Sequence, residues 1–159
     1  MPAFSLPFNS KCSFVVVACL LTTLVTIAYL SDVETLVAPF SATCVLLVLL
    51  PKSPFSQPKT IVLSHIICIG IGTTLVLLPL AFHTLALMLL ATWISTVLMA
   101  TFRVVHAPAV AHAAILSLGQ QNLARYVFWA MVTVLIFAAY AYMVSRVDKS
   151  TANPATPGM

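Results

Sequence analysis

Charged side chains are scarce in this sequence. Only 6% of the 159 residues are charged, with 7 basic and 3 acidic residues, whereas a soluble globular domain carries roughly a quarter. Hydrophobic residues make up 62% of the chain. The stretch 60–102 holds no Lys, Arg, Asp or Glu, which is enough for two membrane crossings of about 20 residues each. The composition excludes a soluble domain and predicts a protein embedded in the lipid bilayer.

Signals of other protein classes are missing too. The basic residues stand singly between apolar segments, so the chain lacks the basic patch of a nucleic-acid-binding protein. The four cysteines show no CxxC spacing, and we interpret them as small hydrophobic residues without a metal or a cofactor. Because neither an HExxH sequence nor a pair of intramembrane Asp residues is present, we do not expect an enzyme.

Six apolar segments follow one another along the chain. They cover 13–30, 36–50, 60–80, 82–102, 104–118 and 126–145, and the second and fifth are short for a full crossing. The first lacks a convincing signal-peptide cleavage site, so we expect it to be retained. The sequence therefore predicts an all-α, polytopic transmembrane helix bundle at 13–147, after a cytoplasmic N-terminal segment at 1–12 and before a disordered tail at 148–159.

The basic residues predict how the segments are oriented. If both termini are cytoplasmic, six of the seven basic residues lie inside, and Arg125 lies outside together with Asp32 and Glu34, in accord with the positive-inside rule. This distribution supports six segments in a multi-pass protein of the cell (inner) membrane. Five segments remain the alternative if one short segment is re-entrant, and formation of a homo-oligomer stays open.

An internal repeat emerges when the chain is shifted by 69 residues. The shift places VAPFSATCVLL at 37–47 over HAPAVAHAAIL at 106–116, with the shared pattern A-P-x-x-A-x-x-x-[LI]-L. The repeat halves are about 13–80 and 82–147, with three segments each. Because three is an odd number, we expect the two halves to have inverted topology in the membrane.

Each short segment contains a proline suited to the start of a helix, Pro39 or Pro108. Helices that begin there would be about 18 Å and 16 Å long, roughly half of the hydrocarbon core. Their N-termini would meet near the bilayer midplane, where free N–H groups and a partial positive charge favour an anion. Two ordinary short helices kinked by proline are the alternative.

The ionisable groups expected at depth are basic or neutral, because every acidic residue lies at a segment boundary or in the tail. This asymmetry favours an anionic or neutral substrate over a cation. His106, just before Pro108, is the first candidate for a ligand or proton-responsive group, with a structural bond to freed backbone as the alternative. His65 is at least as well explained by a structural interhelical hydrogen bond as by function.

Two further groups receive structural interpretations. Tyr126 and other aromatic residues near segment ends are assigned to interfacial belts. Gly70 and Gly72 are assigned to a surface of small residues that allows close helix packing.

The stretches APFSATCVLL, PKSPFSQPKTIVLSH and HAPAVAHAAIL, within roughly 37–118, together resemble the HPP family of small integral membrane proteins. That family is named for a His-Pro-Pro motif, has a GASA-like stretch followed by P-x-S-P-x-A-Q-P and a downstream His, and includes members linked to nitrite transport. The resemblance implies that His106 and Pro108 take the first and third motif positions. Ala107 replaces the middle Pro, Val110 stands where Gly is usual, and Ser41 replaces the leading Gly of the GASA-like stretch.

The leading hypothesis is a small membrane transporter or channel for a small inorganic anion, nitrite-like by the family resemblance. Movement would be passive or proton-coupled, with the anion bound near the midplane between the two half-helix N-termini. The expected substrate-binding residues are His106, Pro108, Ser41, Ala42, Thr43, His65 and His112. The alternative is a non-transporting membrane scaffold or accessory subunit, in which the same motifs only pack the bundle.

Overall fold

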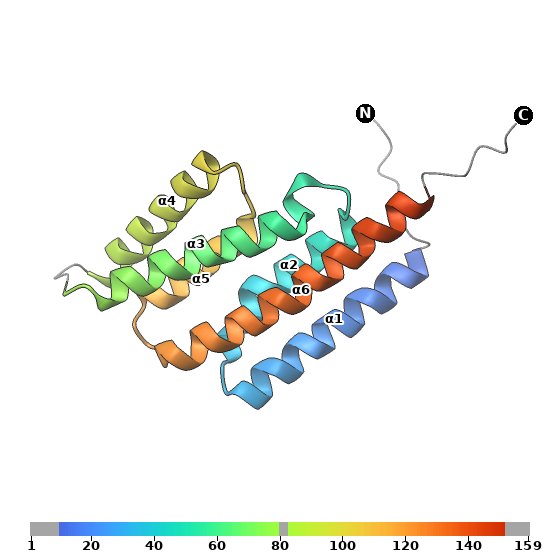
Figure 1. Ribbon diagram of the computed structural model, residues 1–159. Coiled ribbons are helices and arrows are strands. Elements are labelled where there is room, and N and C mark those ends of the chain that lie inside the picture. Colours follow the sequence, from blue (N-terminus) through green and yellow to red (C-terminus); the bar gives the residue numbers. More distant parts are fainter. Residues whose placement is uncertain (1–9, 80–82, 152–159) are drawn as a thin grey trace, which may run out of the picture.

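The computed structural model describes residues 10–79 and 83–151. Within these ranges the chain forms helices and no strand, which confirms the predicted all-α fold (Figure 1). With η denoting a 3-10 helix, the order is α1 (Ser10–Ser31), η1 (Glu34–Leu36), α2 (Val37–Leu49), η2 (Pro54–Ser56), α3 (Pro58–Leu77), α4 (Thr84–Thr101), η3 (Ala107–Ala109), α5 (Val110–Ser117) and α6 (Leu123–Thr151).

Four of these helices, α1, α3, α4 and α6, are long and apolar enough to cross a membrane. Two shorter apolar helices run over Glu34–Leu49 and Ala107–Ser117. The chain is therefore a membrane helix bundle, and its short segments are the second and the fifth, as predicted.

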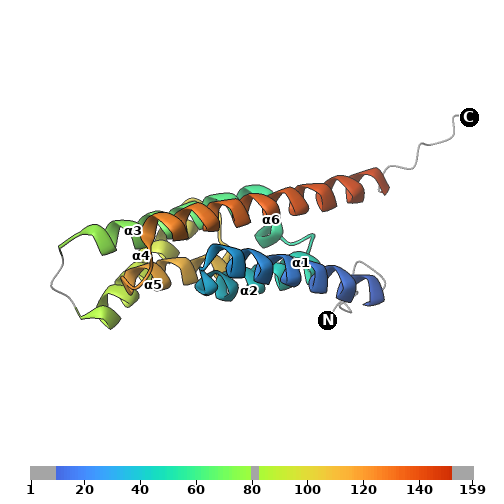
Figure 2. The ribbon, with the colours of Figure 1, turned by 90° about the horizontal axis from the view of Figure 1, so that it is seen from below.

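The two halves of the chain repeat one order of elements: a long helix, a short helix entered through a 3-10 turn, and another long helix. Corresponding helices run in opposite directions along the bundle, which can be followed for α1 and α4, α2 and α5, and α3 and α6 in Figures 1 and 2. This is the arrangement that an inverted repeat requires.

The first short helix begins earlier than predicted. Helix α2 starts at Val37 and directly continues the turn η1, so Pro39 lies inside the first turn instead of at its first position. Proline is tolerated there because the first four N–H groups of a helix have no intrahelical partner. The stretch Glu34–Leu49 is consequently about 24 Å long, and the expected half-helix from Pro39 was too short.

The second short helix matches the prediction closely. After α4 the chain turns at Arg103, which has a φ of 56°, and runs without helix through His106. The turn η3 then places Pro108 near its start. Beyond the end of α5, Gly119 with a φ of 68° supplies the left-handed residue that commonly follows a helix.

Helix α3 packs against α4, α5 and α6, and Gly72 explains its close approach to α5. A Cβ atom at Gly72 would lie 2.8 Å from Cβ of Leu116 and 3.0 Å from Cα of Ala113. A Cβ atom at Gly70 would meet nothing within 4 Å. Of the two glycines assigned to close packing, only Gly72 has that role against the described part of the chain.

Helix α6 extends to Thr151, so the tail that was predicted to be disordered from residue 148 begins with helical residues. The first proline or glycine after Arg146 in the sequence is Pro154, and helices usually end at or before the residue that precedes a proline. Residues 1–9, 80–82 and 152–159 lie outside the described residues. The rest of the predicted tail, most of the predicted N-terminal segment and the boundary between the halves fall in these ranges.

Candidate functional site

Three histidines share one buried site inside the bundle. His65 comes from α3, His106 from the residue before η3 and His112 from α5, and all three are fully buried. The ring of His65 lies 5.2 Å from the ring of His106 and 5.1 Å from that of His112, measured between centroids. We call these three residues the histidine cluster. The structure thus brings together the three histidines that were predicted as ligands.

His106 bonds to the turn η2 through one ring nitrogen and to the first short segment through the other. Its Nδ1 lies 2.8 Å from the carbonyl oxygen of Phe55, and because a carbonyl only accepts, Nδ1 carries the hydrogen. Its Nε2 lies 3.1 Å from Oγ1 of Thr43 on α2. Thr43 follows Ser41 by two residues, so the structure places the first short segment directly beside His106, as the repeat predicted.

His65 stacks on an aromatic ring and bonds within its own helix. Phe40 of α2 lies 5.2 Å away with 6° between the ring planes. Nδ1 of His65 donates to the carbonyl oxygen of Ile61 at 2.8 Å. Among the described residues, Nε2 of His65 is buried without a hydrogen-bond partner, so one imidazole nitrogen at the centre of the cluster is free to bind.

His112 pairs with a tyrosine that the sequence placed elsewhere. Its Nδ1 lies 2.7 Å from the hydroxyl of Tyr126, and Tyr126 is fully buried. The assignment of Tyr126 to an interfacial belt was therefore wrong, because the ring is buried inside the bundle and does not face the membrane surface. His112 supplies the hydrogen-bond partner that a buried tyrosine hydroxyl needs. Nε2 of His112 is a second buried nitrogen without a partner in the described part of the chain.

The other predicted ligands lie outside the cluster. Ser41 is half-buried and its hydroxyl donates to the carbonyl oxygen of Ala38 at 3.0 Å. Ala42 is exposed on α2, whereas Pro108 is half-buried in η3. Of the GASA-like stretch, Thr43 is the residue whose side chain contacts a histidine. Among the described residues, no three His, Cys, Asp or Glu side chains are arranged to hold a metal ion.

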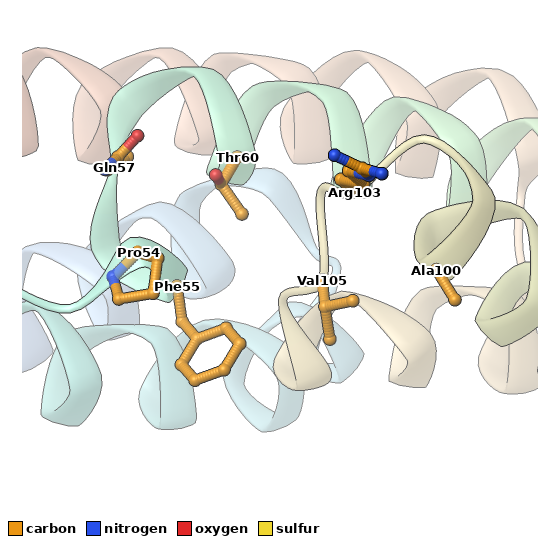
Figure 3. Close-up of a pocket in the computed structure, with 7 residues that line it drawn as sticks. All are labelled: Pro54, Phe55, Gln57, Thr60, Ala100, Arg103 and Val105. Atoms are coloured by element: carbon orange, nitrogen blue, oxygen red, sulfur yellow. The ribbon is translucent and has the colours of Figure 1, made fainter.

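A pocket of about 400 Å³ opens beside the histidine cluster. In Figure 3, Gln57, Thr60 and Arg103 lie along one side of it, and the apolar Phe55 and Val105 lie along the other. The remaining lining residues are Pro54 and Ala100, so none of the described lining residues is acidic. Phe55 belongs to both sites, because its carbonyl oxygen accepts from His106.

Sequence reasoning missed this pocket. The proline-rich stretch 51–59 predicted a break between segments, but it did not predict that the break packs against the chain between α4 and η3. The only available signal was the spacing of Ser53, Pro54, Gln57 and Pro58 before His65, which belongs to the resemblance.

Polar contacts at another point of the bundle tie the two halves together. Arg125 donates to the carboxylate of Asp32 at 3.1 Å, and the Thr35 hydroxyl donates to the side-chain oxygen of Gln121 at 3.2 Å. The ion pair is exposed, so in water it would contribute little stability. It does place Asp32 and Arg125 at one end of the bundle, in agreement with the charge distribution that assigned both to one side of the membrane.

Comparison with known proteins gives one result. No curated protein and no solved structure matches the chain significantly. The family described as HPP, transmembrane region, matches residues 7–154, which is nearly the whole chain and includes every residue of the histidine cluster and the pocket. The chain therefore belongs to the HPP transmembrane family.

Proposed function

We propose that the protein moves a small inorganic anion, nitrite-like in size and charge, across the cell (inner) membrane, with both termini cytoplasmic. The pocket at Arg103 would admit the anion, and the histidine cluster would bind it deeper in the bundle. The observation that carries this proposal is the composition of the pocket: one guanidinium, one amide and one hydroxyl, without a carboxylate.

Electrostatics explains why this composition selects for negative charge. A cleft lined by one sign of charge concentrates ions of the opposite sign. Arg103 has no ion-pair partner among the described residues, whereas Arg125 is paired with Asp32. A cation would meet no carboxylate in the pocket or in the cluster, so its desolvation would stay uncompensated.

The path inward from the pocket is short. The peptide of Phe55 separates the pocket from His106, and the free Nε2 atoms of His65 and His112 lie beyond it. An anion needs hydrogen-bond donors, and an imidazole nitrogen becomes a donor when it carries a proton. A protonated cluster can therefore supply hydrogen-bond donors to an anion inside the bundle.

A flux measurement tests the proposal. The full chain is reconstituted into liposomes, and uptake of nitrite, nitrate, chloride, formate and sodium is measured against protein-free liposomes. We expect uptake of at least one of the anions and none of sodium. Arg103→Gln should lower anion uptake about tenfold, and Arg103→Lys should restore part of it.

Arg125→Gln is the matched control, because Arg125 is a basic and exposed residue like Arg103 but is paired with Asp32 away from the pocket. Its uptake should stay close to that of the unaltered protein. Sodium uptake without anion uptake would refute the proposal, and so would equal losses in the Arg103 and Arg125 variants.

One observation favours the alternative of a non-transporting scaffold or accessory subunit. All three histidines have 0% exposed surface, so this conformation holds the cluster closed on every side. A transporter must open it, whereas a scaffold need not. The absence of uptake for every anion tested would favour the scaffold.

A further inference from the structure

The surroundings of His106 suit both its neutral and its protonated form. In the neutral form Nδ1 donates to Phe55, and Nε2 accepts from the hydroxyl of Thr43. In the protonated form Nε2 donates instead, and the Thr43 hydroxyl turns to the carbonyl oxygen of Pro39, which lies 3.1 Å from Oγ1. Rotation of one hydroxyl thus satisfies either form, and a proton can arrive without breaking the bond to Phe55.

The groups around His106 provide no negative charge for such a proton. The two neighbouring imidazoles are His65 on α3 and His112 on α5. Three further titratable side chains on the packed elements are buried, Cys44 of α2, Cys68 of α3 and Tyr126 of α6, and Tyr140 of α6 is half-buried. The other titratable side chains that the structure describes on these elements and the adjoining loops are exposed, and apart from Tyr142 they are basic: Lys52, Lys59, Arg103, Arg125 and Arg146. None of these described side chains is a carboxylic acid, and Asp32 and Glu34 are exposed outside the cluster. The third acidic residue, Asp148, lies in the last turn of α6, whereas Tyr126 lies in the first.

A buried positive charge without a counter-charge is costly, and so is a buried negative one. When the two are buried together, each offsets much of the penalty of the other. An anion entering the cluster therefore favours protonation of His106, and a proton on His106 favours binding of the anion. By linkage, each must strengthen the other by the same factor.

We infer that His106 takes up one proton for each monovalent anion that the protein carries, so that anion and proton cross the membrane together without net charge. This inference rests on the proposed function and adds the coupling ion. The proton binds to the lone pair of Nε2 from water on one side and returns to water on the other, so no other bond is made or broken. The polar groups continue from His106 through His65 and His112 to the hydroxyl of Tyr126, near the start of α6.

Simultaneous measurement of proton and anion uptake tests the inference. Liposomes that contain the full chain and a trapped pH-sensitive dye receive an inward nitrite gradient, and protein-free liposomes correct for leakage of nitrous acid. We expect one proton per nitrite ion and an initial rate that does not change when valinomycin and potassium clamp the membrane potential. Below saturation, acidifying the outside by one pH unit should raise uptake about tenfold.

His106→Gln separates the proton from the hydrogen bonds. A glutamine amide can donate to Phe55 and accept from Thr43, but it cannot hold a proton at neutral pH. In whatever uptake remains, the ratio of protons to nitrite should fall towards zero. His83→Gln is the matched control: His83 is exposed at the start of α4, so its replacement should leave the ratio at one.

Thr43→Val provides a second measurement if His106→Gln is too slow to follow. It keeps the shape of the side chain but removes the acceptor for protonated Nε2, so half-maximal uptake should shift to a more acidic pH. An unchanged pH profile in Thr43→Val, or an unchanged ratio in His106→Gln, would overturn the role of His106.

The remaining outcomes separate this inference from the proposed function. Nitrite uptake that follows the membrane potential and leaves the dye unchanged would overturn the proton coupling, while anion transport would stand. No uptake of any anion would overturn both.

Discussion

Replacing Gly72 by alanine tests whether the contact between α3 and α5 positions the histidine cluster. The added Cβ would lie 2.8 Å from Cβ of Leu116 and 3.0 Å from Cα of Ala113. Neither atom is the free end of a flexible side chain, so the two helices must move apart. Overpacking of this kind costs about 1–3 kcal/mol.

Gly70→Ala is the matched control. Gly70 lies on the same helix, but a Cβ atom there would meet no described residue within 4 Å. Both variants gain the same helix propensity, about 1 kcal/mol, so this gain cancels when they are compared. We expect Gly72→Ala to be less stable than Gly70→Ala by about 1–3 kcal/mol, with a Tm lower by about 2–4 °C for each kcal/mol.

Thermal unfolding in detergent, followed by circular dichroism, gives the stability, and nitrite uptake gives the function. Gly72 lies two helical turns beyond His65, and Ala113 follows His112 in α5. Parting the helices should separate these two imidazole rings, so uptake should fall in Gly72→Ala alone. Equal melting temperatures for the two variants would refute the close approach. A lower Tm with full uptake by the folded protein would show that the ring contact does not serve transport.

Three further predictions concern the site and the topology. His106→Ala should lower nitrite uptake at least about tenfold, or about 1.4 kcal/mol, in protein that still inserts and elutes as one species; full uptake would leave His106 a structural role. Tyr126→Phe removes the hydroxyl that lies 2.7 Å from Nδ1 of His112, and a buried group left without its partner costs about 1–3 kcal/mol. An unchanged melting temperature would contradict this pairing. Cysteines at the exposed positions Glu34 and Lys59 should react with a membrane-impermeant maleimide from opposite sides, and labelling from one side would contradict the six-segment topology.

The membrane segments could be predicted from the sequence because the free-energy cost of burying charge in lipid depends only on the residues of the segment itself. Stretch 60–102 contains no charged residue, and 51–59 concentrates prolines and lysines, so both follow from composition alone. The repeat pattern then placed the two short helices. The start of α2 could not be predicted to the residue, because Pro39 is compatible with several positions in the first turn of a helix.

The partners of the buried polar groups could not be predicted, because they depend on packing between segments far apart in sequence. The acceptor for His106 is the carbonyl oxygen of Phe55, and a carbonyl leaves no signature in a sequence. Tyr126 stands at the start of an apolar segment, where tyrosines often face the interface, yet it packs inward against His112. His65 fitted two roles equally well until α2 and α5 were seen to pack around it.

The repeated backbone carries an unrepeated set of polar groups. Under the 69-residue shift each buried histidine falls on a residue that carries no charge: His106 on Val37, His112 on Thr43 and His65 on Val134. Arg103 at the pocket falls on Glu34, so an anion would be attracted at one of these equivalent positions and repelled at the other.

The inversion therefore relates the backbone courses of the two halves but not their polar side chains. The polar groups of the site come mainly from the second short segment, with His65 and Thr43 added from the first half. Binding of a small anion and a proton does not need a symmetric site: it needs one buried imidazole that can be satisfied in both protonation states, and the contacts of His106 with Phe55 and Thr43 meet that condition.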